Sequence, residues 1–404
     1  MQIGWIDFSK SDRDKVLGVI QLFAEQTAMD ELGIGTVRDA FANIFFPGTS
    51  TIQTRAKYFF IVSYLLQEAG SGKVGMDVDK AMEWMHNKER VCCQKLVEDA
   101  LSKGESLNGI IGHTALNSKA WIKRKPSDIY WNGVKTLGFF NSKFSLMQNL
   151  SQREYLARSL AMARTMDIKS FGRKRVDIED DMDDTFSLGV GYNKFWNIPK
   201  VNPDWLNELC INLTADEAHF FRTAINSLYP NSVFCALFNS WDIGSKRLGF
   251  HEVMDKVIMQ VDDNTRELLQ LAKKFDIFVF SARACYNVIW SDSANIEAVE
   301  EWGKCSYHLS KIADIDLVHT MEMLKIHQPQ TLRFLSKLQK AYKENADFEE
   351  VKKILIEREV EIKGRSRAKL LKPSKTQTQW IGGKHLDYRS YNTCQLIIDI
   401  YNHV

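Results

Sequence analysis

Residues 30–57 read DELGIGTVRDAFANIFFPGTSTIQTRAK, and this stretch decides the fold expected for the first third of the chain. After a glycine-containing turn, apolar residues over 37–45 recur at the spacing of one helix face. The Pro-Gly pair at 47–48 ends that helix. The next helix, expected over 52–67, is apolar on most sides, which predicts that it is buried.

Outward from this stretch the sequence also indicates helices. A helix is expected over 79–103, and capping-box spacing predicts helix starts at Ser151 with Glu154 and at Thr214 with Glu217. We therefore expect a mainly α, multi-domain protein with minor β structure. The expected parts are a helical N-terminal domain (1–165) with a winged-helix or helix-turn-helix unit near 108–140, a charged connector (166–204), a helical domain (205–345), and a C-terminal helix with a basic tail (346–404).

Composition excludes several classes of protein. Hydrophobic residues make up 45% of the 404 residues, which excludes a largely disordered chain, and the net charge of +2 creates no field over the whole molecule. Seven scattered cysteines without a Cys-x-x-Cys pair argue against a disulfide framework and a cysteine zinc site. No signal peptide or membrane-spanning run is readable, so we expect a cytoplasmic protein that does not contact membrane.

Familiar catalytic motifs are missing from the sequence. It has no phosphate-binding loop, no complete dinucleotide fingerprint, no Gly-x-Ser-x-Gly and no His-Glu-x-x-His. The nine histidines follow no ligand spacing. We therefore expect no cofactor and no metal site, and favour a non-catalytic protein over an enzyme.

The densest polar constellation follows the Pro-Gly pair. Three hydroxyl residues stand where the helix over 52–67 is expected to begin, and free backbone amides at a helix start favour an anion. Arg55 lies four residues beyond Thr51 and could contact a phosphate with two hydrogen bonds. In the alternative interpretation the hydroxyls only cap the helix, and Arg55 pairs with an acid among residues 30–39. The nucleic-acid contacts predicted here are Arg38, Thr49, Ser50, Thr51, Arg55 and Lys57.

Two further basic segments are predicted to contact a nucleic-acid backbone. The first precedes a short helix that carries Asn132 and Lys135, and the second lies in the basic stretch after residue 362. The alternatives are a solvated turn for the first, and a solvated helix end or a partner of the acidic run at 177–184 for the second. The residues concerned are Lys123, Arg124 and Lys125, and Arg365, Arg367 and Lys369.

Four blocks carry a resemblance to a known family: GWIDFS at the start, DELGIGTVRDAFANIFFPGTSTIQTRAKYF, PSDIYW and LDYRS. Together they resemble an uncharacterised bacterial family known only as a domain of unknown function, over most of the chain and most densely before residue 140. The resemblance implies a gene neighbourhood of phage defence, beside helicase-like or nuclease-like proteins. No catalytic residue is established in that family, so the resemblance assigns none.

The sequence thus predicts a non-catalytic accessory subunit that binds nucleic acid, DNA in the first instance, within an anti-phage defence system. One alternative is an enzyme with an unrecognised site, such as a nuclease that uses Asp30, Glu31 and Asp39 around a magnesium ion. Another is a scaffold that binds only proteins.

Overall fold

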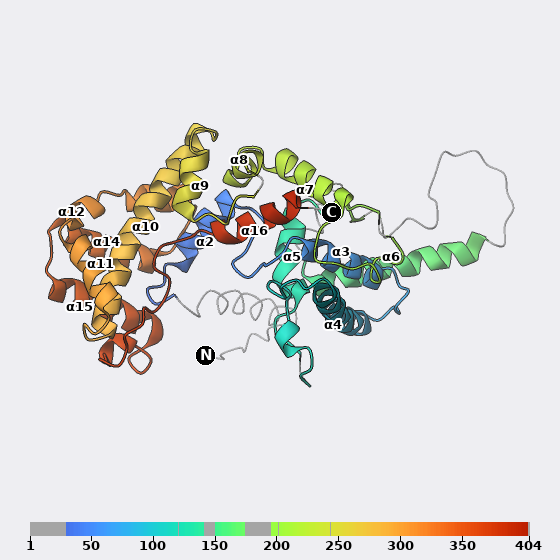
Figure 1. Ribbon diagram of the computed structural model, residues 1–404, viewed down its shortest axis with the longest axis horizontal. Helices are drawn as coiled ribbons and strands as arrows, with labels where there is room; N and C mark the ends of the chain where they lie inside the picture. Colours follow the sequence, from blue (N-terminus) through green and yellow to red (C-terminus); the bar gives the residue numbers. More distant parts are fainter. Residues whose placement is uncertain are drawn as a thin grey trace, which may run out of the picture. The chain divides into compact units, whose positions relative to one another are not determined.

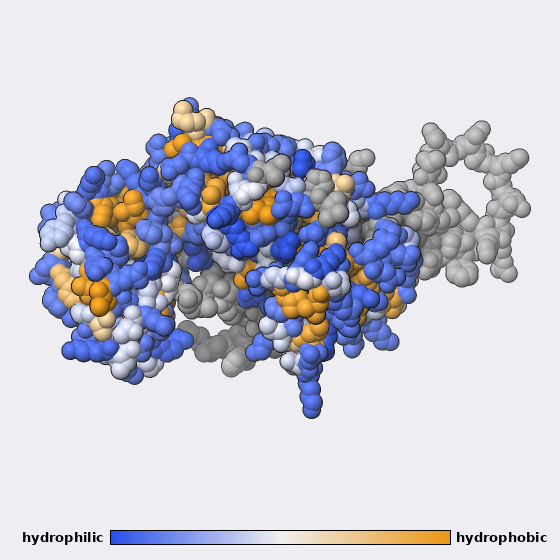
Figure 2. All heavy atoms as spheres, in the orientation of Figure 1, coloured by the Kyte–Doolittle hydropathy of each residue, from blue (hydrophilic) through white to orange (hydrophobic). Residues whose placement is uncertain are grey.

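The computed structural model describes residues 30–119, 121–140, 150–173, 195–200, 202–242 and 244–402, and of 166–173 the backbone only. This part of the chain is mainly helical, as expected, and its β structure is a single antiparallel bridge between Phe140 and Trp196 (Figure 1). The face shown in Figure 2 is mostly hydrophilic, with apolar side chains in small separate patches. Ser9 and Asp12 have the spacing of a capping box, which predicts a further helix start, but these residues lie outside the described part of the chain.

The described residues form two compact units, and each takes two pieces of the chain. Residues 30–42 and 262–388 form unit 1, and residues 43–261 and 389–402 form unit 2. The division differs from the predicted boundaries because each unit is completed by a segment distant in sequence. The predicted connector, 166–204, lies largely outside the described residues, and α6 (Gln152–Arg173) extends into it.

Unit 1 is built around a long, largely buried helix, α10, which packs against α11 and α15. Polar residues begin its helices: Asp262 accepts a hydrogen bond from the backbone N–H of Thr265, and Asp347 accepts one from Glu350. Asp30 holds the start of α2 (Gly35–Phe45), accepting from the amides of Ile34 and Gly35. The other helices are α10 (Asp263–Trp290), α11 (Ile296–Ser306), α12 (Leu309–Ile312), α13 (Leu317–Met323), α14 (Pro329–Lys343), α15 (Phe348–Lys363) and η4 (Lys369–Leu371).

Unit 2 surrounds α3 (Lys57–Gly70), which is buried over nearly its whole length and packs against α4, α5 and α6. Aromatic rings fill the space around it, with Phe59 edge-on to Tyr130 at 4.8 Å between centroids. Gly133 lets α5 approach closely, because a Cβ there would lie 2.4 Å from the carbonyl oxygen of Gly48. The other helices are α4 (Val78–Ser102), η1 (His113–Ala115), α5 (Pro126–Thr136), α7 (Ala215–Leu228), α8 (Val233–Asn239), α9 (Phe250–Val257) and α16 (Ser390–Tyr401).

Most helix starts agree with the sequence, but the start of α3 does not. The capping boxes at Ser151 and Thr214 are present. The helix expected from residue 52 begins only at Lys57, because the hydroxyl of Tyr130 accepts hydrogen bonds from the amides of Thr54 and Arg55 and holds this segment out of the helix.

The winged-helix or helix-turn-helix unit expected near 108–140 is not confirmed. In the described residues of this range, a loop with the 3₁₀ turn η1 leads into the single α-helix α5. Tyr130, Trp131 and Val134 of α5 are buried in unit 2, so this helix face is not open to a groove of DNA. None of the described helices combines the length and apolar character needed to cross a membrane.

Candidate functional site

The anion site predicted at the start of α3 is occupied by the protein's own carboxylate. Asp399 of α16, 4% exposed, accepts two hydrogen bonds from Arg55 Nε, at 2.9 and 3.0 Å, and one from the amide of Ala56, the N-cap of α3. Gln395 donates to the same carboxylate. Burial raises the pKa of Asp399, and the Arg55 guanidinium opposes that rise. Arg55 and a backbone amide at the start of α3 do bind an anion, as expected, but that anion is the carboxylate of Asp399.

Lys57 is likewise committed to a buried ion pair. Its ammonium lies 2.7 Å from Glu217 Oε2, and the exposed fractions of the two side chains are 7% and 2%. The hydroxyl of Tyr64 donates to Glu217 Oε1 at 2.9 Å. Burial and the neighbouring Glu217 charge raise the pKa of Tyr64, so this hydroxyl keeps its proton. Lys57 therefore stabilises unit 2 and does not present its charge to solvent.

The other predicted residues of this segment divide between internal contacts and the surface. The hydroxyl of buried Thr49 donates to the carbonyl of Phe46, and the amide of Ser50 donates to Gln53. Thr51 is exposed, and Arg38, in unit 1, pairs with Asp39 at 3.0 Å. Within unit 2, Arg55 and Lys57 are paired internally, so they do not form one cationic surface with the hydroxyls of residues 49–51.

The basic loop, defined here as residues 121–125, remains at the surface of unit 2. Lys123 is exposed, and Arg124 and Lys125 are half-buried. Lys123 and Lys125 have no ion pair among the described residues. This segment keeps the cationic character that the sequence predicts.

Acidic side chains, however, occupy the amino end of α5 beside this loop. Asp128 accepts the amide of Lys125 at 3.0 Å, and Glu89 accepts the amide of Ser127 at 2.6 Å. A phosphate cannot use these amides, so any contact here comes from the loop's side chains.

In unit 1, the basic stretch divides into paired and exposed residues. Lys363 and Lys369 both pair with Glu31, and Lys363 also pairs with fully buried Glu359. Arg365 and Arg367 are exposed. The acidic run at 177–184, named as an alternative partner, lies outside the described residues.

The acids named for a magnesium site have other roles in unit 1. Asp30 caps α2, Glu31 lies between two lysines, and Asp39 holds Arg38. Lysines already neutralise Glu31, so the three carboxylates do not form an open acidic cluster of the kind that Mg²⁺ binds. The structure gives the nuclease alternative no support.

A groove in unit 2 was not predicted as a whole. It has a volume of about 1140 Å³ and lies between the carboxyl end of α5, α7 and residues 197–200. Asn132 and Lys135, which the sequence had placed on one helix, both line it. The contribution of residues 197–200 has no local sequence signal, because it depends on the Phe140–Trp196 bridge, and that of α7 depends on contacts distant in sequence, such as Phe220 with Phe139.

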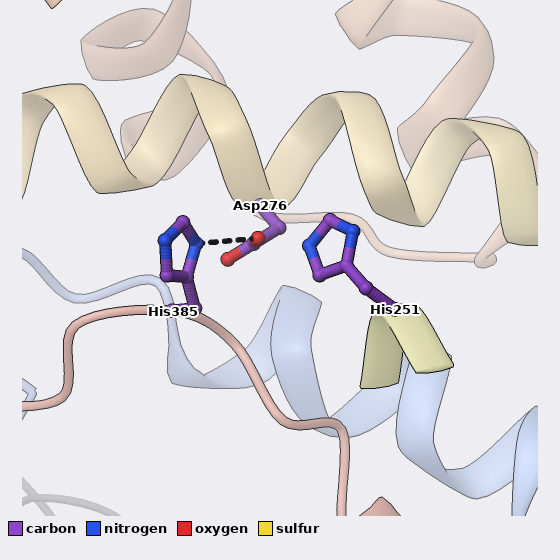
Figure 3. Close-up of side chains that lie close together, drawn as sticks. All are labelled: His251, Asp276 and His385. Carbon is purple, nitrogen blue, oxygen red and sulfur yellow. Dashed lines mark hydrogen bonds and ion pairs between the residues drawn. The ribbon is translucent and has the colours of Figure 1, made fainter. Parts of the chain in front are cut away.

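Unit 1 also contains an aspartate–histidine pair that the spacing of histidines did not indicate. Fully buried Asp276 of α10 is hydrogen-bonded to His385 Nδ1 at 2.8 Å and accepts the amide of Leu386 (Figure 3). The ring of Phe280 stacks on His385 at 4.0 Å. A buried carboxylate of this kind orients an imidazole, but two groups do not define a reaction. His251, also drawn in Figure 3, belongs to unit 2. In the sequence, the feature that could have indicated this pair is a single Asp within the otherwise apolar run of residues 275–280.

Comparison with known proteins agrees with the resemblance found in the sequence. Residues 1–167 match the model of a family of unknown function, DUF6361. No curated protein and no solved structure matches the chain. The likeness to a domain of unknown function is thereby confirmed for the first part of the chain, and its link to phage defence stays a prediction.

Proposed function

We propose that this protein is a non-catalytic accessory subunit that binds nucleic acid through the basic loop of unit 2. The observation that carries the proposal is a contrast in charge pairing. Arg55 and Lys57 are neutralised by buried carboxylates, whereas exposed Lys123 and half-buried Lys125 have no such partners among the described residues. Unpaired surface cations attract phosphates and release counterions when they bind.

The two ends of the loop are held by hydrogen bonds before any ligand arrives, Trp121 at its start and Lys125, whose amide donates to Asp128 at 3.0 Å, at its end. Arg90 of α4 donates to the carbonyl of Ser118, at 3.0 Å, and to that of Leu116. Trp121 donates to the carbonyl of Gly112 at 3.2 Å. A preformed loop loses less conformational entropy on binding than a flexible one. This favours a binding role for the loop over that of an ordinary solvated turn.

The test replaces Lys123, Arg124 and Lys125 with Ala and measures filter binding of single- and double-stranded DNA and RNA at low and high salt. We expect weaker binding, and a slope of log affinity against log salt that is smaller by up to about 0.9 for each phosphate that the variant no longer neutralises. The control replaces three scattered exposed lysines of unit 2, Lys73, Lys80 and Lys246, with Ala, which changes the net charge equally.

Two outcomes contradict the proposal. If the loop variant and the control variant bind equally well, the loop is not the interface. If the unaltered protein retains no nucleic acid at low salt, it does not bind nucleic acid and the protein-only scaffold is favoured instead.

The proposal extends to a partner. We place the subunit in anti-phage defence beside a helicase-like or nuclease-like protein, as the resemblance implies. Affinity purification from the native host, followed by mass spectrometry, is expected to recover such a protein. If neither a helicase-like nor a nuclease-like protein is recovered, the proposed partner is contradicted. The proposal that the basic loop binds nucleic acid is not affected by that result.

A further inference from the structure

We infer that the groove between α5 and α7 holds a single strand of nucleic acid a few nucleotides long; this rests on the proposed function. The polar wall of the groove comes from three elements that are distant in sequence. α5 contributes Asn132 and Lys135, α7 contributes His219, and the segment after the Phe140–Trp196 bridge contributes Asn197 and Lys200. The bridge holds this last segment beside α5, since Asn197 also donates its backbone amide to the carbonyl of Phe139 at 2.7 Å.

The charge of the groove suits phosphates. Lys135, Lys200 and His219 have no ion pair in the described part of the chain, and Asp216 is the acid among the described lining residues. Lys135 lies over the ring of Trp131, at 5.7 Å from the centroid, so its ammonium is positioned by packing. A strand of phosphodiesters can therefore follow this wall.

Apolar side chains line the same groove beside its cationic groups. Phe220 is half-buried, packs edge-on against Phe139 at 4.8 Å and lines the groove together with Pro199 and Leu228. Leu228 is 49% exposed. The face of an unpaired base can stack on such apolar side chains, and its edge can form hydrogen bonds with an amide such as that of Asn132. In a duplex the base faces are stacked on one another and are not accessible. The mixture of apolar, amide and cationic groups fits a single strand better than a duplex.

The size of the groove sets the length of the ligand. At about 1140 Å³ it exceeds the range of roughly 300–1,000 Å³ that is usual for small-molecule pockets. A lone nucleotide would leave most of this volume to water. The geometry therefore points to a short stretch of a longer chain.

The experiment measures the affinity of oligonucleotides of equal length and sequence in single- and double-stranded form. The groove variant carries Asn132→Ala, Lys200→Ala and His219→Ala, three exposed positions at which the fold should tolerate change. We expect its affinity for the single strand to fall about tenfold or more, and its affinity for the duplex to change by less than about twofold. The control carries the same three types of substitution at exposed positions outside the groove: Asn87→Ala, Lys80→Ala and His308→Ala.

Photo-crosslinking gives an independent readout that does not depend on the variants. A single-stranded oligonucleotide containing 4-thiouridine is expected to crosslink to peptides within residues 132–140, 197–200 or 216–229. Crosslinks confined to other peptides overturn the inference, as does a groove variant that binds the single strand like the unaltered protein.

The two proposals fail in different ways. If the protein binds single strand and duplex equally through the basic loop, and the groove variant behaves as the control, only the groove assignment is lost. If the unaltered protein binds neither form, the proposed function is lost as well.

Discussion

Replacing Glu89 with Gln should change how the stability of the protein depends on pH. Glu89 lies on α4, is 1% exposed, and accepts the amide of Ser127 through Oε1. Its other oxygen, Oε2, has no hydrogen-bond partner among the described residues. Burial raises the pKa of Glu89 from 4.5 to about 8, and the hydrogen bond from Ser127 opposes the rise. The folded protein therefore holds this carboxyl group protonated near neutral pH.

The sign of the effect follows from proton binding. Between about pH 4.5 and pH 8 the folded state keeps the Glu89 proton while the unfolded chain releases it, so the free energy of unfolding falls as pH rises. At about 1.4 kcal/mol per pKa unit, the loss between pH 5 and pH 8 is about 4 kcal/mol. Glutamine has nearly the same shape and does not titrate, so the variant should lack this loss.

Urea denaturation followed by circular dichroism at pH 5, 6, 7 and 8 measures the difference. An unpaired N–H of the glutamine amide would lower the free energy of unfolding of the variant by the same amount at every pH. This constant cost does not change how the free energy of unfolding depends on pH, so it cancels from the comparison. Glu83→Gln, at an exposed position of the same helix, is the matched control. The free energy of unfolding is plotted against pH for the unaltered protein and for Glu89→Gln. If the two plots run parallel to within about 1 kcal/mol, Glu89 is ionised in the folded state and the reasoning is wrong.

Two further predictions concern packing in the units. Lys57→Ala leaves Glu217 buried without its cation, so we expect a loss of about 3–5 kcal/mol in the free energy of unfolding, and a much smaller loss when Glu217→Gln is added. Equal losses in the single and double variants would contradict this. Gly133→Ala should cost about 1–3 kcal/mol, because the new Cβ meets the carbonyl of Gly48. Gly303→Ala is the control: Gly303 is also helical, its Cβ meets nothing within 4 Å, and the substitution should stabilise the protein by up to about 1 kcal/mol. Thermal denaturation that ranks the two glycine variants in the opposite order would refute the close approach.

Local signals in the sequence predicted local structure well. The capping residues Ser151 and Thr214 begin helices where expected, because their partners lie three residues away. The start of α3 was misplaced because Tyr130, some 75 residues further along, binds the amides that would have begun the helix. Local spacing cannot reveal such a partner.

The same limit applies to the candidate site. Arg55 was rightly given a carboxylate partner in the alternative interpretation, but the acids considered lay among residues 30–39 and the real one is Asp399, 344 positions away. The basic loop was visible because its three cations are adjacent in sequence. Only part of the groove was visible, since its walls come from three separate segments.

The interleaving of the two units has a consequence for synthesis on the ribosome. Arg55 and Ala56 emerge early, yet the carboxylate that satisfies them arrives with α16, after nearly all of unit 1 has been translated. Until then the nascent chain exposes an apolar α3 whose amino end lacks its acceptor. Contacts of such long sequence separation form slowly, so we expect the growing polypeptide to depend on chaperones until α16 is released.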